Sequence, residues 1–128
     1  MPGLHHVEIW IADAETAHRD WGWLLGRLGF VETARWSEGS SWEAGGVYLT
    51  FTTSPNLAAA AHDRRRPGMN HLAFRGGSRQ DVDALLADAA GHGWSPLYHD
   101  RYPHAGGPDH YAGWIENADG FKAEIVAE

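Results

Sequence analysis

The sequence predicts an α+β fold built from two βαβββ modules. The first observation is an internal repeat, in which residues 4–9 are matched 65 residues later by residues 69–74. Each segment alternates apolar and polar side chains like a strand and has a histidine just before an aliphatic residue. The second is that each run precedes an amphipathic helical segment and then a glycine with an aromatic residue, Gly29-Phe30 and Gly93-Trp94. The third is that turn residues divide the rest of each half into three short strands.

The first module, about residues 1–54, opens with a strand over residues 4–11. Asp13 is a helix N-cap residue, and Trp21, Leu24, Leu25 and Leu28 then recur at the spacing of one helix face. Gly29 is expected to end this helix. Three strands are predicted after it, over residues 30–36, 41–44 and 47–53.

The second module, about residues 69–128, repeats this plan after a linker of about residues 55–68. Ser78 and Asp81 resemble a capping box at the start of a helix, and Gly91 is expected to end it. Its buried face is predicted to consist of Val82, Leu85, Leu86 and Ala89. Strands follow over residues 95–99, 110–115 and 121–126, with a loop at residues 100–109. Residues 1–128 are therefore expected to form one domain.

The composition narrows the class of protein. A net charge of −7 argues against nucleic-acid binding, and the basic run of residues 64–66 is expected to be a solvated loop or a dimer contact. No apolar run is long enough to span a bilayer, and the N-terminus lacks a signal-peptide pattern, so a cytoplasmic location is expected. The absence of cysteine excludes thiolate metal sites and cysteine nucleophiles.

A polar site is predicted where the repeat returns a histidine to the same place. Side chains alternate across a strand, so His6 shares a face with Glu8 in the first module. Glu124 lies between Ala123 and Ile125 on the last predicted strand, where an unpaired charge is costly. A carboxylate in that position needs a cation or a donor, and two histidines on central strands can complete a metal shell.

Four segments together resemble the vicinal oxygen chelate superfamily, which includes glyoxalase I, extradiol dioxygenases, fosfomycin-resistance transferases and bleomycin-binding proteins. These segments are residues 4–7 with Asp13, 24–30, 69–74 and 117–124. The resemblance covers almost the whole chain. It implies the glyoxalase/bleomycin resistance/dioxygenase fold, in which curved mixed sheets enclose a cavity.

The resemblance also implies a metal site with His6, His71 and Glu124 as ligands. The family's remaining ligand position falls on Thr50, where glyoxalase I-like members usually have a carboxylate. Two histidines and one carboxylate suit one divalent ion, Fe, Mn, Zn or Ni, and leave room for a substrate to chelate it through vicinal oxygens. His5 is the alternative to His6, because a one-residue slip exchanges the two faces, but the match to His71 favours His6.

Further residues are assigned to the same cavity. Tyr48 and Thr50 are expected to line it, with Trp10 and either Trp36 or Trp42 as aromatic walls, although core packing is the alternative for each tryptophan. Candidate proton-transfer groups are Glu8 and, from the loop before the last hairpin, His104, His110 and Tyr111. A rim salt bridge is the alternative for Glu8, and a solvated loop is the alternative for the others.

The sequence therefore favours a divalent-metal-dependent enzyme that binds a small substrate through vicinal oxygens, with glyoxalase-, lyase- or dioxygenase-like chemistry. Trp114 stands where extradiol dioxygenases have a tyrosine, which weakens that assignment. The alternatives are a metal-free drug-sequestering protein of the bleomycin-resistance type and a catalytically silent module. The resemblance implies a homodimer. The substrate, the metal and whether the site lies within or between chains are left open.

Overall fold

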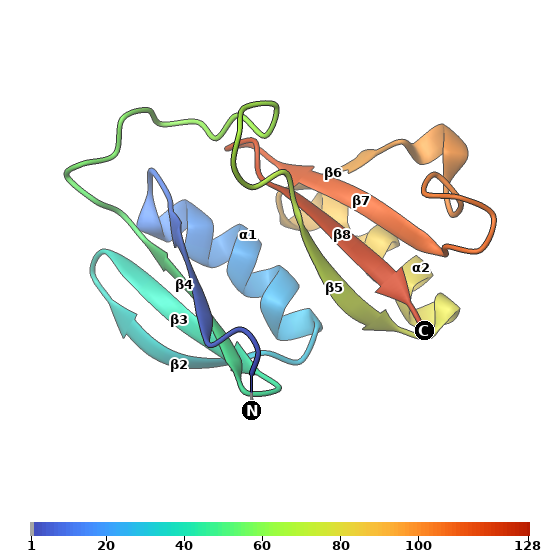
Figure 1. Cartoon of the computed structure of the whole chain (residues 1–128), viewed down its shortest axis with the longest axis horizontal. Helices are drawn as coiled ribbons and strands as arrows, with labels where there is room; N and C mark the ends of the chain where they lie inside the picture. The colour runs from blue at the N-terminus through green and yellow to red at the C-terminus, as the bar shows by residue number, and fades with distance from the viewer. Residues whose placement is uncertain (1) are drawn as a thin grey trace. The chain divides into compact units, whose positions relative to one another are not determined.

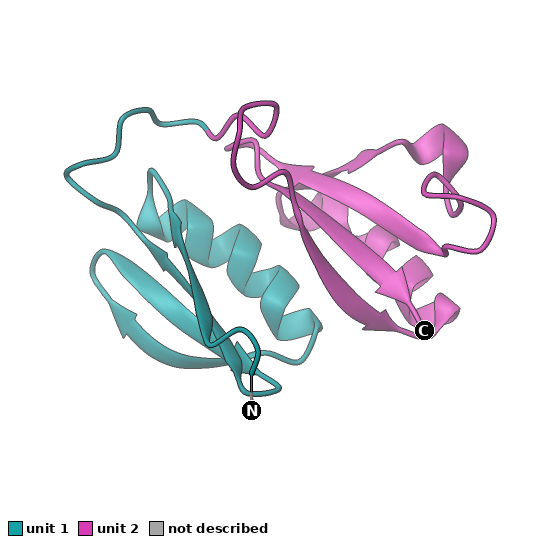
Figure 2. Cartoon of the chain, viewed as in Figure 1, with its two compact units in different colours: residues 1–61 teal, residues 62–128 magenta. Residues whose placement is uncertain are grey.

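The computed structural model describes residues 2–128 of the chain and divides it into two compact units, Met1–Ala61 and His62–Glu128 (Figure 2). The boundary falls within residues 55–68, where the sequence predicts a linker. In each unit one long helix packs on its own four-stranded sheet (Figure 1). Within residues 2–128 the helices are all too short or too polar to cross a membrane.

The first unit contains β1 (His6–Trp10), α1 (Ala14–Arg27), β2 (Val31–Trp36), β3 (Gly39–Ala44) and β4 (Val47–Thr52). Its strands lie in the order β1-β4-β3-β2. β1 is parallel to β4, and the other neighbours are antiparallel. The predicted helix and strands are confirmed, with bounds that differ by one or two residues at most ends.

Helix α1 begins and ends where local chemistry requires. The Asp13 carboxylate accepts a hydrogen bond from the Thr16 amide at 3.1 Å, which satisfies one of the free N–H groups of the first turn. Gly29 has φ +93°, a left-handed conformation that ends the helix without a Cβ penalty. Trp21, Leu24 and Leu25 are buried against the sheet, as their spacing predicts.

The second unit repeats this topology. Its elements are β5 (Leu72–Gly77), α2 (Arg79–Ala89), the short 3-10 helix η1 (Ala90–His92), β6 (Trp94–Leu97), a second 3-10 helix η2 (His99–Arg101), β7 (Ala112–Asn117) and β8 (Lys122–Ala127). The strand order is β5-β8-β7-β6, with β5 parallel to β8 and the remaining pairs antiparallel. The prediction of two similar α+β modules is confirmed.

Most boundaries in this unit differ from the prediction by one to three residues. The Ser78 capping box is present, but the helical path continues past Gly91 through η1 and ends at Gly93, which has φ +90°. β6 stops at Leu97 because Tyr98 has φ +56°, which no strand accommodates. β7 begins at Ala112, so His110 lies in the loop before the strand.

Strand alternation gives each sheet two different faces. One face packs on the unit's own helix and is apolar, with Ile9, Leu49 and Phe51 in the first unit and Phe74, Ala123 and Ile125 in the second. We call the opposite face of each sheet its helix-free face. In the first unit it carries His6 beside Tyr48 and Glu8 beside Thr50. In the second unit Trp114 is paired with Glu124 on that face.

Candidate functional site

Glu124 is the centre of a buried polar cluster on the helix-free face of the second unit. It lies on β8 and is only 6% exposed. Its Oε1 is 2.9 Å from His71 Nε2, and its Oε2 is 2.5 Å from His110 Nε2. Both oxygens of the carboxylate therefore have an imidazole partner, which offsets the cost of burying the charge.

The strand register brings these three side chains together. In the parallel β5–β8 pair Ala73 is opposite Glu124, and His71 shares the face of Ala73 because it lies two residues earlier. The backbone alternation before β7 sends His110 toward Trp114, whose ring centroid is 6.1 Å away, on the same face as Glu124. Two of the predicted metal ligands and one predicted proton-transfer residue thus lie in contact.

Asn70 determines which nitrogen of His71 carries a proton. Its Nδ2 donates to the Arg64 carbonyl oxygen at 3.1 Å, so its Oδ1, 2.8 Å from His71 Nδ1, must accept a hydrogen bond from that nitrogen. His71 Nε2 is then left to face an acceptor-only carboxylate. That contact is favourable only when a proton or another cation lies between His71 Nε2 and Glu124.

This donor set fits a divalent metal ion. Imidazole nitrogen and carboxylate oxygen are ligands for Fe, Mn, Zn and Ni, and a hydrogen bond from the second ring nitrogen is the usual support of a ligating histidine. Across residues 2–128, however, no group of three or more histidine, cysteine or acidic side chains is arranged to hold a metal ion. Glu124 is instead engaged by two imidazoles in this arrangement.

The predicted ligand of the first unit, His6, has a different environment. Its ring stacks on Tyr48, with centroids 4.7 Å apart and planes 4° from parallel, because the two residues are opposite each other in the β1–β4 pair. Its Nδ1 is 2.8 Å from His5 Nδ1, so one of these nitrogens donates and the other accepts. Both histidines are exposed within the described structure.

The other predicted pocket residues of the first unit divide between the two sheet faces. On the helix-free face Trp10 Nε1 donates to Glu8 Oε2 at 2.8 Å, and Thr50 Oγ1 is 2.8 Å from Ser41 Oγ. Trp42 instead lies on the face toward α1. It is 8% exposed, and its Nε1 donates to Ser40 Oγ at 3.0 Å. The structure does not bring Trp42 to the side of the sheet where Tyr48 and Thr50 lie.

Two of the predicted proton-transfer residues lie away from Glu124. The Tyr111 hydroxyl donates to Asp83 of α2 at 2.7 Å, on the opposite face of the sheet from His110. Hydrogen bonds from Tyr102 and Tyr111 lower the pKa of Asp83, and the bond to Asp83 raises the pKa of Tyr111. His104 is exposed, and its ring meets the edge of Tyr111 at a centroid distance of 5.7 Å.

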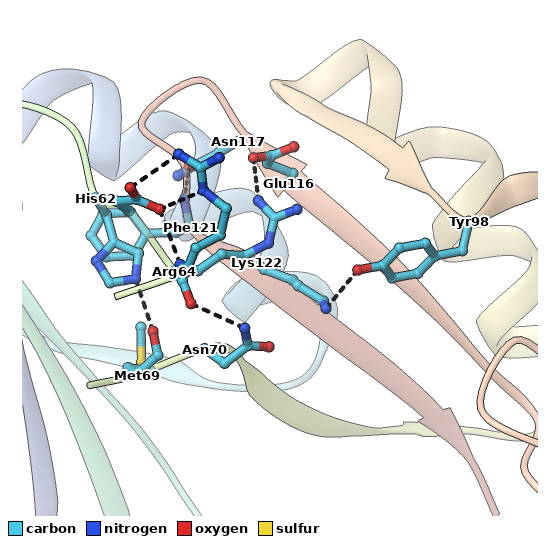
Figure 3. Close-up of polar contacts among 11 residues, drawn as sticks. His62, Arg64, Met69, Asn70, Tyr98, Glu116, Asn117, Phe121 and Lys122 are labelled. Atoms are coloured by element: carbon cyan, nitrogen blue, oxygen red, sulfur yellow. Dashed lines mark hydrogen bonds and ion pairs between the residues drawn. The ribbon is translucent and has the colours of Figure 1, made fainter. Parts of the chain in front are cut away.

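Sequence reasoning missed a second polar group on the same face, shown in Figure 3. Lys122 Nζ donates to Tyr98 Oη at 2.9 Å, and Arg64 Nη1 donates to Glu116 Oε1 at 2.6 Å. The basic run of residues 64–66 was expected to be a solvated loop or a dimer contact. Arg65 and Arg66 are exposed and pair with Asp63, as a solvated loop implies, whereas Arg64 turns inward to Glu116. The available signal for Lys122 was its position two residues before Glu124, which places both on one face.

Comparisons with known proteins agree with the repeated topology. The profile of the Glyoxalase/Bleomycin resistance protein/Dioxygenase superfamily matches residues 5–114. The protein YqjT of Bacillus subtilis (strain 168) is 41% identical over 126 residues, which cover 97% of this chain and 98% of YqjT. The crystal structure of a candidate glyoxalase from Bacillus halodurans is 43% identical, with a TM-score of 0.91, and the match covers 98% of this chain and 95% of that one.

A more distant structure shares the fold. It is the fosfomycin resistance protein FosX of Listeria monocytogenes, crystallised with Mn(II) and a dihydroxypropylphosphonic acid. It is 14% identical with a TM-score of 0.67, over 98% of this chain and 90% of that one. The extent of the profile match and the identity to the two Bacillus proteins show that this chain belongs to the glyoxalase/bleomycin resistance protein/dioxygenase superfamily, which confirms the resemblance found in the sequence.

Proposed function

We propose that this protein is a divalent-metal-dependent enzyme that binds a small substrate through two neighbouring oxygens, with His71 and Glu124 as metal ligands. One observation carries the proposal: Asn70 places a proton on His71 Nδ1, so Nε2 faces the buried Glu124 carboxylate and either a second proton or a metal ion must lie between them. A relative described as a candidate glyoxalase, 43% identical, supports enzyme chemistry of this type.

Each residue of the cluster has a distinct role in this proposal. His71 and Glu124 would hold the ion, and Asn70 would keep the His71 ring in the ligating tautomer. His110, at the other oxygen of Glu124, moves a proton to or from the substrate. The bound ion would act as a Lewis acid toward an anionic form of the substrate. His6 remains the predicted third ligand, and Glu8, Tyr48 and Thr50 the predicted pocket residues of the first unit.

Metal content is the direct test. Protein purified without chelator is expected to contain close to one Fe, Mn, Zn or Ni per chain by elemental analysis, and His71→Ala and Glu124→Gln are expected to lose it. Asn70→Ala should retain folding but bind metal about 10- to 100-fold more weakly, since it loses only the support of His71. Asn56→Ala, which replaces an exposed asparagine of the first unit, is the matched control.

The variants also separate the ligand assignments. Full metal content in His71→Ala would refute the proposed site. An unchanged metal content in His6→Ala, with loss of metal in His71→Ala, would remove only His6 from the ligand set.

We further propose that the protein is a homodimer, and light scattering on the same samples would measure its oligomeric state. Wild-type protein that neither contains nor takes up metal would overturn the enzyme proposal.

A drug-sequestering function is the second candidate, and one observation favours it. Trp10 and Trp36 are each 41% exposed, and pairing through Thr52 and Gly39 puts them in one row on the helix-free face of the first unit. Exposed aromatic rings suit a flat ligand, and a net charge of −7 suits a cationic one. Quenching of tryptophan fluorescence by a bleomycin-type drug in metal-free protein would support this function, whereas no response would exclude it.

A further inference from the structure

Lys122 is the only lysine in the chain, and it is buried. It is 7% exposed and lies on β8, two residues before Glu124 and on the same helix-free face. In the sheet it is paired with Glu116 of β7, and on its other side the β5–β8 register continues to His71. A lysine ammonium is therefore held in the same buried layer as the proposed metal ligands.

The carboxylates beside Lys122 are engaged elsewhere. Glu116 accepts from Arg64 Nη1 at 2.6 Å, and Glu124 is in contact with His71 and His110. The side-chain acceptor that Lys122 Nζ reaches is the Tyr98 hydroxyl, at 2.9 Å, and the ammonium also lies 4.9 Å from the centre of that ring. Burying an ammonium without a carboxylate partner leaves its desolvation cost largely uncompensated, so an anion bound beside it would be stabilising.

Tyr98 takes an unusual backbone conformation to reach this position. Its φ of +56° and ψ of 31° are left-handed, which is uncommon for a residue with a side chain and concentrates at functional sites. The ring meets Trp114 at 72° with centroids 5.8 Å apart, and the Arg101 guanidinium lies 5.1 Å from its centre. Figure 3 shows the phenol and the Lys122 side chain extending toward each other.

The electrostatics of the pair favour negative charge. The hydrogen bond from Lys122 lowers the pKa of the Tyr98 phenol, and Arg64 acts in the same direction. Lys122 and Arg64 carry two positive charges beside this hydroxyl, and Glu116, which pairs with Arg64, carries one negative charge, so the group as a whole is positively charged. An anionic oxygen placed here would accept from Lys122 Nζ and Tyr98 Oη together.

We propose that Lys122 and Tyr98 form a binding site for an anionic group of the substrate, either a carboxylate or a phosphoryl group. This inference rests on the proposed function, because that function places the substrate near Glu124. Residues two apart on a strand are roughly 7 Å apart, so a small molecule bound near Glu124 can also reach Lys122. The substrate class is therefore a small oxygenated anion whose charged group is separated from its chelating oxygens by a few bonds.

The single lysine makes the test specific. In protein labelled with [ζ-15N]lysine, one side-chain ammonium resonance reports on Lys122. Inorganic phosphate and acetate are titrated in separate samples, with sodium chloride keeping the ionic strength constant. We expect a saturable shift. Saturation with phosphate alone identifies a phosphoryl site, and saturation with acetate alone identifies a carboxylate site. Calorimetric titration of the same anions provides a second measurement that does not depend on the resonance.

Two variants and a control decide the outcome. Tyr98→Phe should weaken anion binding at least fivefold, and Lys122→Met, which preserves the length of the buried side chain, should abolish it. Arg66→Gln removes an exposed cation that pairs with Asp63 and should change nothing. The proposal is overturned if neither anion saturates the signal in the wild-type protein, or if Tyr98→Phe and Lys122→Met bind as well as the wild type.

The metal content of Lys122→Met separates a failure of the anion-site proposal from a failure of the proposed metal-dependent function. Lys122 is not a proposed ligand, so the variant is expected to retain its metal. A wild-type protein with no metal but saturable anion binding would refute the enzyme proposal and leave the anion site standing. A metal-loaded wild-type protein that binds neither phosphate nor acetate would refute the anion site and leave the enzyme proposal standing.

Discussion

At the scale of single residues, the hydrogen-bonding capacity of each side chain decides its neighbours. Glu124 can only accept, and it is engaged by two imidazoles. Asn70 can donate and accept, and it uses both abilities to connect the Arg64 backbone to His71. Asp83 accepts from two tyrosine hydroxyls on the other side of the sheet. The same unit thus contains phenols that donate to a carboxylate and one phenol, Tyr98, that accepts from an ammonium.

This difference predicts the order in which the tyrosines ionise. Burial and the bond to Asp83 raise the pKa of Tyr102, the same bond raises that of Tyr111, and Lys122 lowers that of Tyr98. In a pH titration followed at the tyrosinate absorbance, Tyr98 is expected to ionise before Tyr102 and Tyr111. Tyr98→Phe should remove the early phase, and Asp83→Asn should move the late phase to lower pH.

The sign of the effect on stability follows from these shifts. Tyr102 and Tyr111 have folded-state pKa values above the unfolded value of about 10, so their contribution is complete below that pH and is lost as the pH rises above it. Tyr98 has the opposite sign, because its contribution is present above pH about 10 and is lost as the pH falls through its lowered pKa. An Asp83→Asn variant with an unchanged late phase would contradict this assignment.

The sequence singled out His71, Glu124 and His110 as candidate site residues, but it did not show which of them are in contact. The alternation around Glu124 and the repeat around His71 are local patterns, and register then placed the two residues in contact. The contact of Arg64 with Glu116 joins residues 52 apart, and nothing within the basic run of residues 64–66 distinguishes the arginine that turns inward. Lys122 was not assigned a role, although the same alternation places it beside Glu124.

At the scale of helices and strands, close backbone contacts fix the positions of some glycines. Gly39 begins β3, and a Cβ there would lie 2.1 Å from the Phe51 carbonyl oxygen of β4. A neighbouring strand cannot move aside without losing its own hydrogen bonds. Gly26 of α1 differs, because a Cβ there would have no neighbour within 4 Å. The two glycines therefore form a matched pair for mutation.

Gly39→Ala is expected to lower the free energy of unfolding by about 1–3 kcal/mol, as an overpacked site does. Gly26→Ala is expected to raise it by up to about 1 kcal/mol, because alanine favours the helix and restricts the unfolded chain. Urea unfolding of the two variants beside the wild-type protein measures both. Equal effects of the same sign would show that the contact between β3 and β4 does not control this position.

The number and order of the strands were predictable from the sequence, but the end of β6 and the start of β7 were not. Tyr98 carries no local signal for a left-handed conformation, since glycine and asparagine are the residues usually found there. Its conformation depends on Lys122 and Trp114, which come from other strands. The sequence predicts a strand from His110, and only the pairing of Ala112 with Val126 shows where β7 begins.

At the scale of the whole molecule, the two units share a topology but differ in charge. The repeat aligns Thr50 with Glu124 and Tyr48 with Lys122, so the first unit has neutral side chains where the second has buried charges. Buried charges stabilise a fold only when they are paired. The stability of the second unit should therefore depend on what occupies its helix-free face.

Metal binding is accordingly expected to stabilise the protein against heat. At a metal concentration 100 times Kd, the folded state gains about 2.7 kcal/mol, which corresponds to a rise in Tm of roughly 10 °C for a domain of this size. Calorimetry with and without chelator measures the change. Glu124→Gln and His71→Ala should show no metal-dependent rise in Tm. An equal rise in these variants would place the ion elsewhere.

The single buried lysine also has a practical consequence for labelling the protein. Lys122 is the only primary amine among the side chains, so amine-reactive reagents meet one side-chain target, which is shielded in the folded state, and the α-amino group. A dye or surface coupled by this chemistry would attach at the N-terminus of native molecules. A second attachment would occur only in molecules that had opened the sheet around β8, so the share of doubly labelled chains would report the fraction of molecules that had opened.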